Sequence, residues 1–194
     1  MVVALSWITL LMVITTSTGL LLSRNWRWSL GLLAAQYLGV FWMIQTHWPI
    51  SMAAAKIVTG WMACAVLGIA QLNNSGVKPA GIVWPRRQMF QIITTGMVLA
   101  VTFAGASKTA TWLGLSLPIA WGGIALIGLG LLHLGITSDG FRVILGLLTL
   151  LAGFDILYTA VESSALVTAL LMVVNLGLAL TGAYFLSAPQ ENLS

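Results

Sequence analysis

The segment Leu117–Ile136, with the sequence LPIAWGGIALIGLGLLHLGI, decides the fold class of this chain. None of its residues is Asp, Glu, Lys or Arg. A helix rises 1.5 Å per residue, so a run of about 20 residues crosses the ~30 Å hydrocarbon core of a bilayer. Backbone groups in lipid must be hydrogen-bonded within the segment, which a continuous helix achieves and an open strand does not. We therefore interpret this segment as a transmembrane helix.

The rest of the chain repeats this pattern. Of its 194 residues, 59% are hydrophobic and only 6% are charged, with a mean hydropathy of +1.01. A soluble domain has about 25% charged residues, so this chain has too few to cover a globular surface. We expect an all-α integral membrane protein of about seven transmembrane helices. Besides the first segment, the expected spans are residues 3–22, 28–46, 49–71, 88–107, 141–160 and 163–186.

The basic residues predict the orientation of these spans. With seven spans, six of the seven basic residues in loops fall on one side of the membrane, and only Lys108 falls on the other side. Cytoplasmic loops are enriched in Lys and Arg, so we expect the N-terminus outside and the C-terminus in the cytoplasm of a bacterial inner membrane, or of another energy-transducing membrane. The net charge of +4 is spread singly or in pairs, and nucleic acid is not an expected partner. The loops on the cytoplasmic side contain Arg24, Arg27, Lys78, Arg86, Arg87 and Arg142.

A sequence motif that occurs twice suggests how the spans are organised. The motif Arg27-x-x-x-Gly31-Leu-Leu opens the second span, and Arg142-x-x-x-Gly146-Leu-Leu opens the sixth. Both arginines fall on the cytoplasmic side, so the expected repeat is parallel. The predicted organisation is a first three-helix unit at 1–71, a cytoplasmic loop and connector helix at 72–116, and a second three-helix unit with a short cytoplasmic tail at 117–194.

Two charged residues lie inside predicted spans, Lys56 and Asp155. Each lies about 10 Å from the outer end of its span, at 1.5 Å per residue. Opposite charges at matching depth favour a buried pair, which could act as a two-station proton relay or ion path. The alternatives are a structural salt bridge between helices, or a Lys56 side chain that extends outward to the interface.

Further polar and small residues lie within the spans. Gln36 and Asn175 are candidates for lining an ion path, and interhelical hydrogen bonding is the alternative. Small residues spaced four apart let helices approach closely in lipid. Lys56 shares such a face in the third span, so we expect it to point toward protein. The predicted packing residues are Gly31, Ala35, Gly39, Gly60, Cys64 and Gly68.

The chain contains few residues of the types that form catalytic sites. It contains four acidic residues, two histidines and one cysteine, and it shows no nucleotide-binding, zinc-protease or hydrolase motif. His133 has no second histidine at a ligand spacing. We expect no metal, no cofactor and no enzyme activity of its own, and at most a non-catalytic role in a membrane oxidoreductase complex.

Two stretches resemble a known family. Residues 24–70, with Arg27-x-x-x-Gly31-x-x-Ala34-x-Gln36 and then Lys56, resemble the N-terminal half of hydrogenase-4 component E. Residues 128–186, with the Arg142 motif, resemble its C-terminal half. That half is similar to the K-type subunit of respiratory complex I and to the C subunit of Mrp-type antiporters. The resemblance implies a membrane-arm subunit packed between larger antiporter-like subunits.

The chain departs from the K-type pattern at its acids. The family has a glutamate nine residues after this arginine and another acid in the next helix, whereas this chain has Leu151 and no acid in 165–174. Asp155, one turn beyond Leu151, could substitute on the same helix face. Otherwise the second unit would be a scaffold that does not conduct protons.

The expected function is that of a small membrane-arm subunit of a multisubunit ion- or proton-translocating complex. The alternatives are a free-standing small transporter or channel, and a membrane assembly factor without transport. A transporter usually contains broken helices near mid-membrane. No proline interrupts a span interior, although the glycines of 117–136 leave this alternative open.

Overall fold

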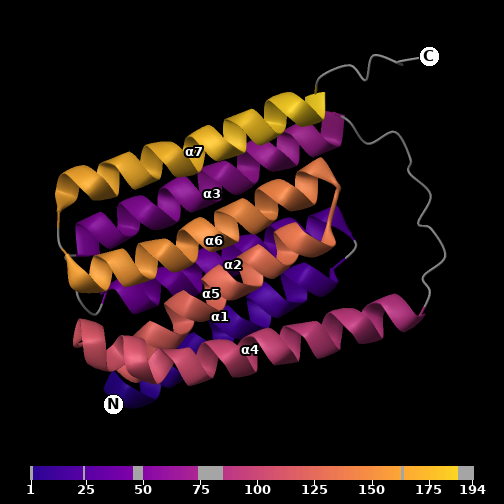
Figure 1. The fold of residues 1–194 in the computed structure, drawn as a ribbon. Helices are drawn as coiled ribbons and strands as arrows, with labels where there is room; N and C mark the ends of the chain where they lie inside the picture. The colour runs from indigo at the N-terminus through magenta and orange to yellow at the C-terminus, as the bar shows by residue number, and fades with distance from the viewer. Residues whose placement is uncertain (1, 24, 46–49, 74–84, 163, 188–194) are drawn as a thin grey trace.

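The computed structural model describes residues 2–23, 25–45, 50–73, 85–162 and 164–187. Over these residues the secondary structure is entirely helical, which confirms the all-α prediction. Successive helices run in alternating directions, so the start of the first helix and the end of the last lie at opposite ends of the bundle (Figure 1). The described helices are α1 (Val2–Leu22), α2 (Trp26–Gln45), α3 (Ile50–Asn73), α4 (Pro85–Leu113), α5 (Leu117–Ile136), α6 (Gly140–Val161) and α7 (Ala165–Ser187).

Six of these helices, all except α2, contain segments long and apolar enough to cross a membrane. The fold is therefore that of an all-α membrane protein. Helix α2 has 20 residues, as α5 does, but it is more polar because it contains Arg27, Gln36 and Gln45. Its length and its place inside the bundle suit a seventh span, which stays a prediction.

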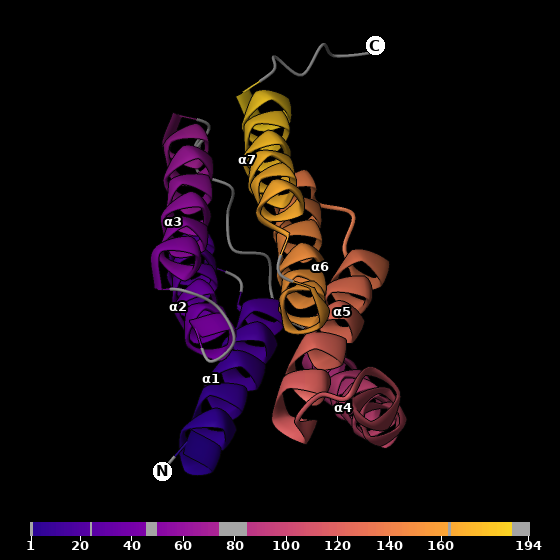
Figure 2. The ribbon, with the colours of Figure 1, turned by 90° about the vertical axis from the view of Figure 1, so that its left-hand side faces the viewer.

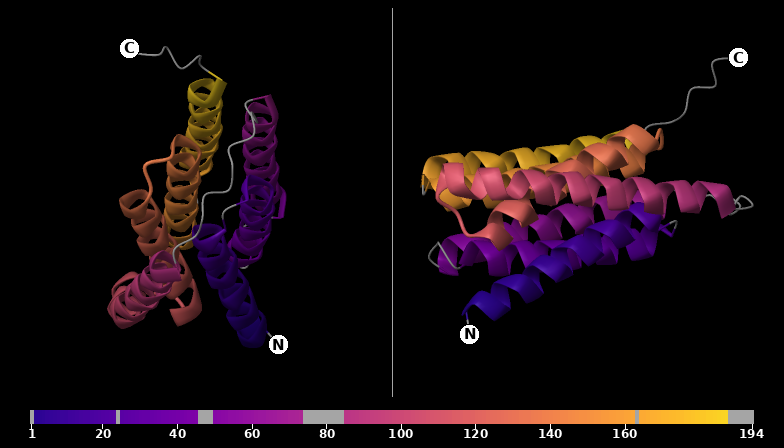
Figure 3. Two further views of the ribbon diagram at one scale, coloured as in Figure 1. Left: turned by 90° about the vertical axis from the view of Figure 1, so that its right-hand side faces the viewer. Right: turned by 60° about the horizontal axis from the view of Figure 1, so that its bottom comes forward.

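The helices form two rows, with α1, α2 and α3 in one row and α5, α6 and α7 in the other (Figure 2). Each helix contacts its counterpart across the rows, so that α1 packs on α5, α2 on α6 and α3 on α7. The view from the opposite side shows the same rows, with α4 outside α5 (Figure 3). The loop at 74–84 lies outside the described residues.

The two rows have the same spacing along the chain. Helix α5 starts at Leu117 and α1 at Val2, whereas α7 starts at Ala165 and α3 at Ile50, so both starts are offset by 115 residues. This arrangement is the one that two parallel three-helix units joined by α4 would adopt. The division of the chain into such units stays a prediction.

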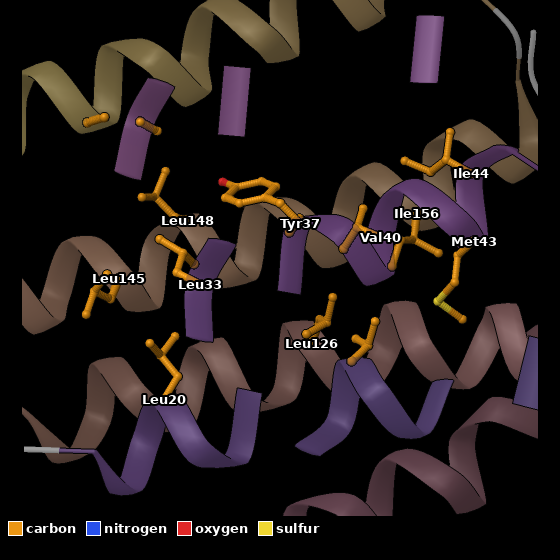
Figure 4. Close-up of a cluster of buried hydrophobic side chains, with 14 of the residues drawn as sticks. Leu20, Leu33, Tyr37, Val40, Met43, Ile44, Leu126, Leu145, Leu148 and Ile156 are labelled. Carbon is orange, nitrogen blue, oxygen red and sulfur yellow. The ribbon is translucent and has the colours of Figure 1, made fainter. Parts of the chain in front are cut away.

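The core lies between the two rows. Leu33 and Val40 of α2 meet Leu126 of α5 and Leu148 of α6, and all four side chains are buried (Figure 4). Helices α5 and α6 approach each other closely, and a Cβ on Gly153 would lie 2.6 Å from the Gly123 backbone oxygen. Close backbone approach of this kind is the usual way in which helices associate in lipid.

The predicted packing residues have different surroundings. A Cβ on Gly39 would lie 2.6 Å from the Val13 side chain, and one on Gly60 would lie 2.5 Å from the Tyr37 ring. Gly68 is in ordinary contact with α2, Cys64 packs at the edge of the core, and Ala35 is partly buried. Gly31 is different, because a Cβ there would meet nothing within 4 Å.

Helix α4 is longer than the apolar run 88–107 indicates, because it continues to Leu113. Within this extension, the Thr109 hydroxyl donates to the Gly105 carbonyl of its own helix. Gly114 then ends the helix with φ +66, and the Leu115 N–H donates to the Ala110 carbonyl. This is a Schellman C-cap, for which glycine is favoured.

Candidate functional site

A buried ion pair joins the two rows. Lys56 Nζ of α3 lies 2.6 Å from Asp155 Oδ1 of α6, and the two side chains are only 7% and 10% exposed. The structure brings these residues together, as their matching depth predicts. Lys56 points to Asp155 and does not extend outward to the interface.

Helix packing holds Lys56 in place. Gly60, one turn beyond Lys56, lies against the ring of Tyr37, so α3 can approach α2 closely there. Lys56 therefore lies on the small-residue face of α3, which points toward protein, as expected. On α6, the Thr159 hydroxyl donates a 2.6 Å hydrogen bond to the Asp155 carbonyl, which gives this polar side chain a partner within its own helix.

A second polar contact joins α2 to α7. The Tyr37 hydroxyl donates a hydrogen bond of 2.7 Å to Oδ1 of Asn175, and both residues are buried. Asn175 is one of the residues expected from the sequence, whereas Tyr37 is not. The signal that could have indicated Tyr37 is a phenol in mid-span, because a buried tyrosine usually finds a hydrogen-bond partner.

The two polar contacts share one pocket. Its polar lining comes from Tyr37, Lys56, Thr59, Asp155 and Asn175, and its apolar lining comes from Val40, Phe41 and Met172. The cavity is about 10 Å³, which is close to the space that one water molecule requires. The close-up shows Tyr37 between Leu33, Leu148 and Val40, so the core borders this pocket (Figure 4).

Gln36 does not line this pocket, although the sequence suggests it as a candidate for the same path. Its side chain is fully buried, and neither its amide nitrogen nor its amide oxygen has a hydrogen-bond partner in the described part of the chain. Gln36 is adjacent to Tyr37, but consecutive residues of a helix do not face the same way. The structure thus separates Gln36 from the other three candidates.

A third polar contact ties the rows at the opposite end. Arg142, near the start of α6, donates from Nη2 to the Ser23 carbonyl, at 2.9 Å, just beyond the end of α1. A cation at the C-terminal end of a helix is favoured by the helix dipole. Arg27, the matching arginine of the repeated motif, is exposed and lies over the adjacent Trp26 ring. The two arginines of the repeated motif therefore differ in their surroundings.

The residue types of the site suit proton chemistry more than metal binding. A carboxylate and an ammonium in contact form a neutral unit, and a proton that moves from Lys56 to Asp155 leaves both groups uncharged. The other pocket side chains are neutral at ordinary pH. No group of three His, Cys, Asp or Glu residues that could hold a metal ion occurs among the residues described.

No protein-family model, curated protein or solved structure matches this chain. The resemblance to hydrogenase-4 component E therefore depends on the quoted residues alone.

Proposed function

We propose that this chain is a small membrane subunit of an ion- or proton-translocating complex, and that Lys56 and Asp155 are its charge-carrying residues. The observation that carries the proposal is their 2.6 Å contact, buried between two rows of apolar helices.

The energetic argument favours a role beyond packing. Removing two charges from water costs several kcal/mol per ion, and well-packed apolar residues often hold helices together as well or better. Intramembrane ionisable residues commonly mark ion or proton paths. Lys56 and Asp155 are the two charged side chains that are buried among the described residues. A salt bridge at this position is costly if it only holds the helices together, and it is suited to a role in which the two groups exchange protons.

The surroundings suit a pair whose protons can be moved by a neighbour. Tyr37 and Asn175 line the same pocket and supply polar atoms without adding charge. Whether the protons rest on Lys56 or on Asp155 then depends on the local field, to which a nearby charge in a partner contributes strongly because the local dielectric is low. A larger subunit with its own charged residues could therefore shift the proton between Lys56 and Asp155.

The exterior of the bundle suits assembly with other membrane helices. Little of the described chain lies outside the helices, and the outer faces of α4 and α7 are apolar and broadly exposed. A Cβ on Gly96 or Gly105 of α4, or on Gly177 of α7, would meet nothing within 4 Å. Small residues on open faces permit close approach of a partner helix.

Co-purification tests the proposal. The tagged chain is extracted from its native host in mild detergent, and its partners are identified by native mass measurement. We expect larger antiporter-like membrane subunits in a fixed ratio. A stable species that contains this chain alone, and that moves an ion in vesicles, would establish the free-standing transporter in its place. A chain found only with unassembled subunits would establish the assembly factor.

A paired variant tests the role of the two charges in the assembled complex. Replacing both residues, Lys56→Met with Asp155→Asn, removes the charges and leaves no lone ion. We expect the complex to assemble and its ion translocation to fall several-fold. Lys108→Met, on the exposed side of α4, is the matched control. Translocation at the wild-type rate in the double variant would reduce the pair to a structural role.

A further inference from the structure

We propose that the pocket beside the ion pair binds one water molecule, which joins Lys56 and Asp155 to Tyr37 and Asn175 in a single hydrogen-bonded network. This inference depends on the pocket and its lining alone, and it holds whether or not the chain belongs to a larger complex.

The size of the pocket restricts its occupant. The cavity of about 10 Å³ matches the space that one water requires and excludes organic ligands. Side chains from α2, α3, α6 and α7 line it, so both rows contribute. A polar cavity of this size, with several hydrogen-bonding groups, meets the conditions under which buried water is found.

The charge of the pocket selects a neutral occupant. Lys56 and Asp155 compensate each other, and the other side chains that line the pocket carry no charge. An added cation or anion would leave one uncompensated charge in a low-dielectric interior, which costs several kcal/mol. Water adds no charge and has both donors and acceptors.

The lining groups offer the bonds that a water needs. Lys56 Nζ lies 2.6 Å from Asp155 Oδ1, and this contact occupies one of the three N–H groups of the ammonium and one of the lone pairs of the carboxylate. The ammonium thus has further N–H groups to donate, and the carboxylate has further lone pairs to accept.

The two neutral residues complete the set. Asn175 accepts from Tyr37 through Oδ1, so its NH₂ group remains to donate elsewhere. Thr59 donates its hydroxyl proton to the Lys56 carbonyl, at 2.9 Å, so its oxygen can accept. A water that accepts from Lys56 and Asn175, and donates to Asp155 and Thr59, satisfies all four of its own bonds.

Radiolytic hydroxyl-radical labelling of the full chain in nanodiscs tests this site, because bound water generates radicals beside buried side chains. Tyr37 and Phe141 are matched aromatic residues, with 5% and 4% exposure, and Phe141 lies in the apolar core. We expect Tyr37 to gain oxygen several-fold faster than Phe141, after correction for intrinsic reactivity. With H₂¹⁸O as solvent, the added oxygen should carry the isotope.

Thr59→Val gives the decisive comparison, because it keeps the side-chain shape and removes one acceptor from the pocket. We expect labelling of Tyr37 to fall several-fold toward that of Phe141. Thr149→Val is the control, since Thr149 is buried, donates to its own helix at Leu145, and lies outside the pocket. Equal slow labelling of Tyr37 and Phe141, equal fast labelling of both, or an unchanged Tyr37 signal in Thr59→Val would each overturn the proposal.

Discussion

Tyr37 and Asn175 join α2 to α7 by a 2.7 Å hydrogen bond, and this contact is the counterpart of the one between Lys56 and Asp155. The counterparts of α3 and α6 in the opposite rows are α7 and α2. At the offset of 115 residues, Lys56 corresponds to Leu171, and Asn175 lies four residues further along its helix, which is about one turn. One contact is charged and the other is neutral, and both line the same pocket between the rows.

Substitutions of Lys56 and Asp155 should have strongly non-additive effects on the free energy of unfolding. Lys56→Met or Asp155→Asn alone leaves a buried group without its counter-charge, and we expect each to lower the free energy of unfolding by about 3–5 kcal/mol. The double variant should cost much less than the sum of the two, because it leaves no lone charge. Denaturation of the purified proteins in detergent gives the three values. Additive costs would show that the two side chains do not interact.

The hydrogen bond between Tyr37 and Asn175 should contribute less to stability than the charged contact does. Tyr37→Phe removes the hydroxyl donor and leaves Asn175 Oδ1 without it, and we expect a loss of about 0.5–1.7 kcal/mol, the range for interhelical hydrogen bonds in membranes. Tyr184→Phe is the matched control, because Tyr184 is 71% exposed on α7. Equal stability of the two variants, measured by the same denaturation, would contradict a structural role for the bond.

Glycine substitutions should separate close helix contacts from open faces. Gly153→Ala places a Cβ 2.6 Å from the Gly123 backbone oxygen, so α5 and α6 must move apart. We expect a loss of about 1–3 kcal/mol, as is typical of overpacking. Gly105→Ala adds the same methyl group where nothing lies within 4 Å, and its stability should equal or exceed that of the wild type. Thermal denaturation in detergent compares them, and similar losses at both positions would show that the α5–α6 contact is looser than described.

The contact of Arg142 with the Ser23 carbonyl should make Arg142 more important for stability than Arg27, the matching arginine of the repeated motif. Arg142→Gln removes the donor to the Ser23 carbonyl and the cation at the end of α1, so we expect a loss of about 1–2 kcal/mol. Arg27→Gln should have little effect, since Arg27 is exposed. The melting temperatures of both variants test this difference. Equal losses would mean that the repeated motif has one shared structural role.

The sequence predicts much of the fold because lipid imposes simple rules. A span must be apolar, helical and about 20 residues long, so most helix positions follow from composition alone. The end of α4 is an exception, because Lys108 and Thr109 continue the helix beyond its apolar run. Depth along a helix is equally simple to count, and it was enough to bring Lys56 and Asp155 to the same level.

Which way a residue faces is harder to predict in this chain. In a soluble helix the polar face marks the exterior, but here both faces are apolar, so the periodicity is weak. Gln36 and Tyr37 are adjacent polar residues, and only Tyr37 reaches the pocket. Gly31 and Gly153 are both small residues in spans, and only Gly153 lies at a close helix contact. Such distinctions depend on the crossing of helices and not on local sequence.

The orientation of the bundle gives a last prediction. An odd number of spans places the two ends of the chain on opposite sides of the membrane, and the start of α1 and the end of α7 lie at opposite ends of the bundle (Figure 1). With Arg27 and Arg142 on the cytoplasmic side, as the positive-inside rule requires, α7 must end in the cytoplasm. Fused to this end, green fluorescent protein should fluoresce and alkaline phosphatase should be inactive. The reverse pattern, with a silent fluorescent fusion and active phosphatase, would place Lys56 and Asp155 near the cytoplasmic surface and would require partners that reach them from that side.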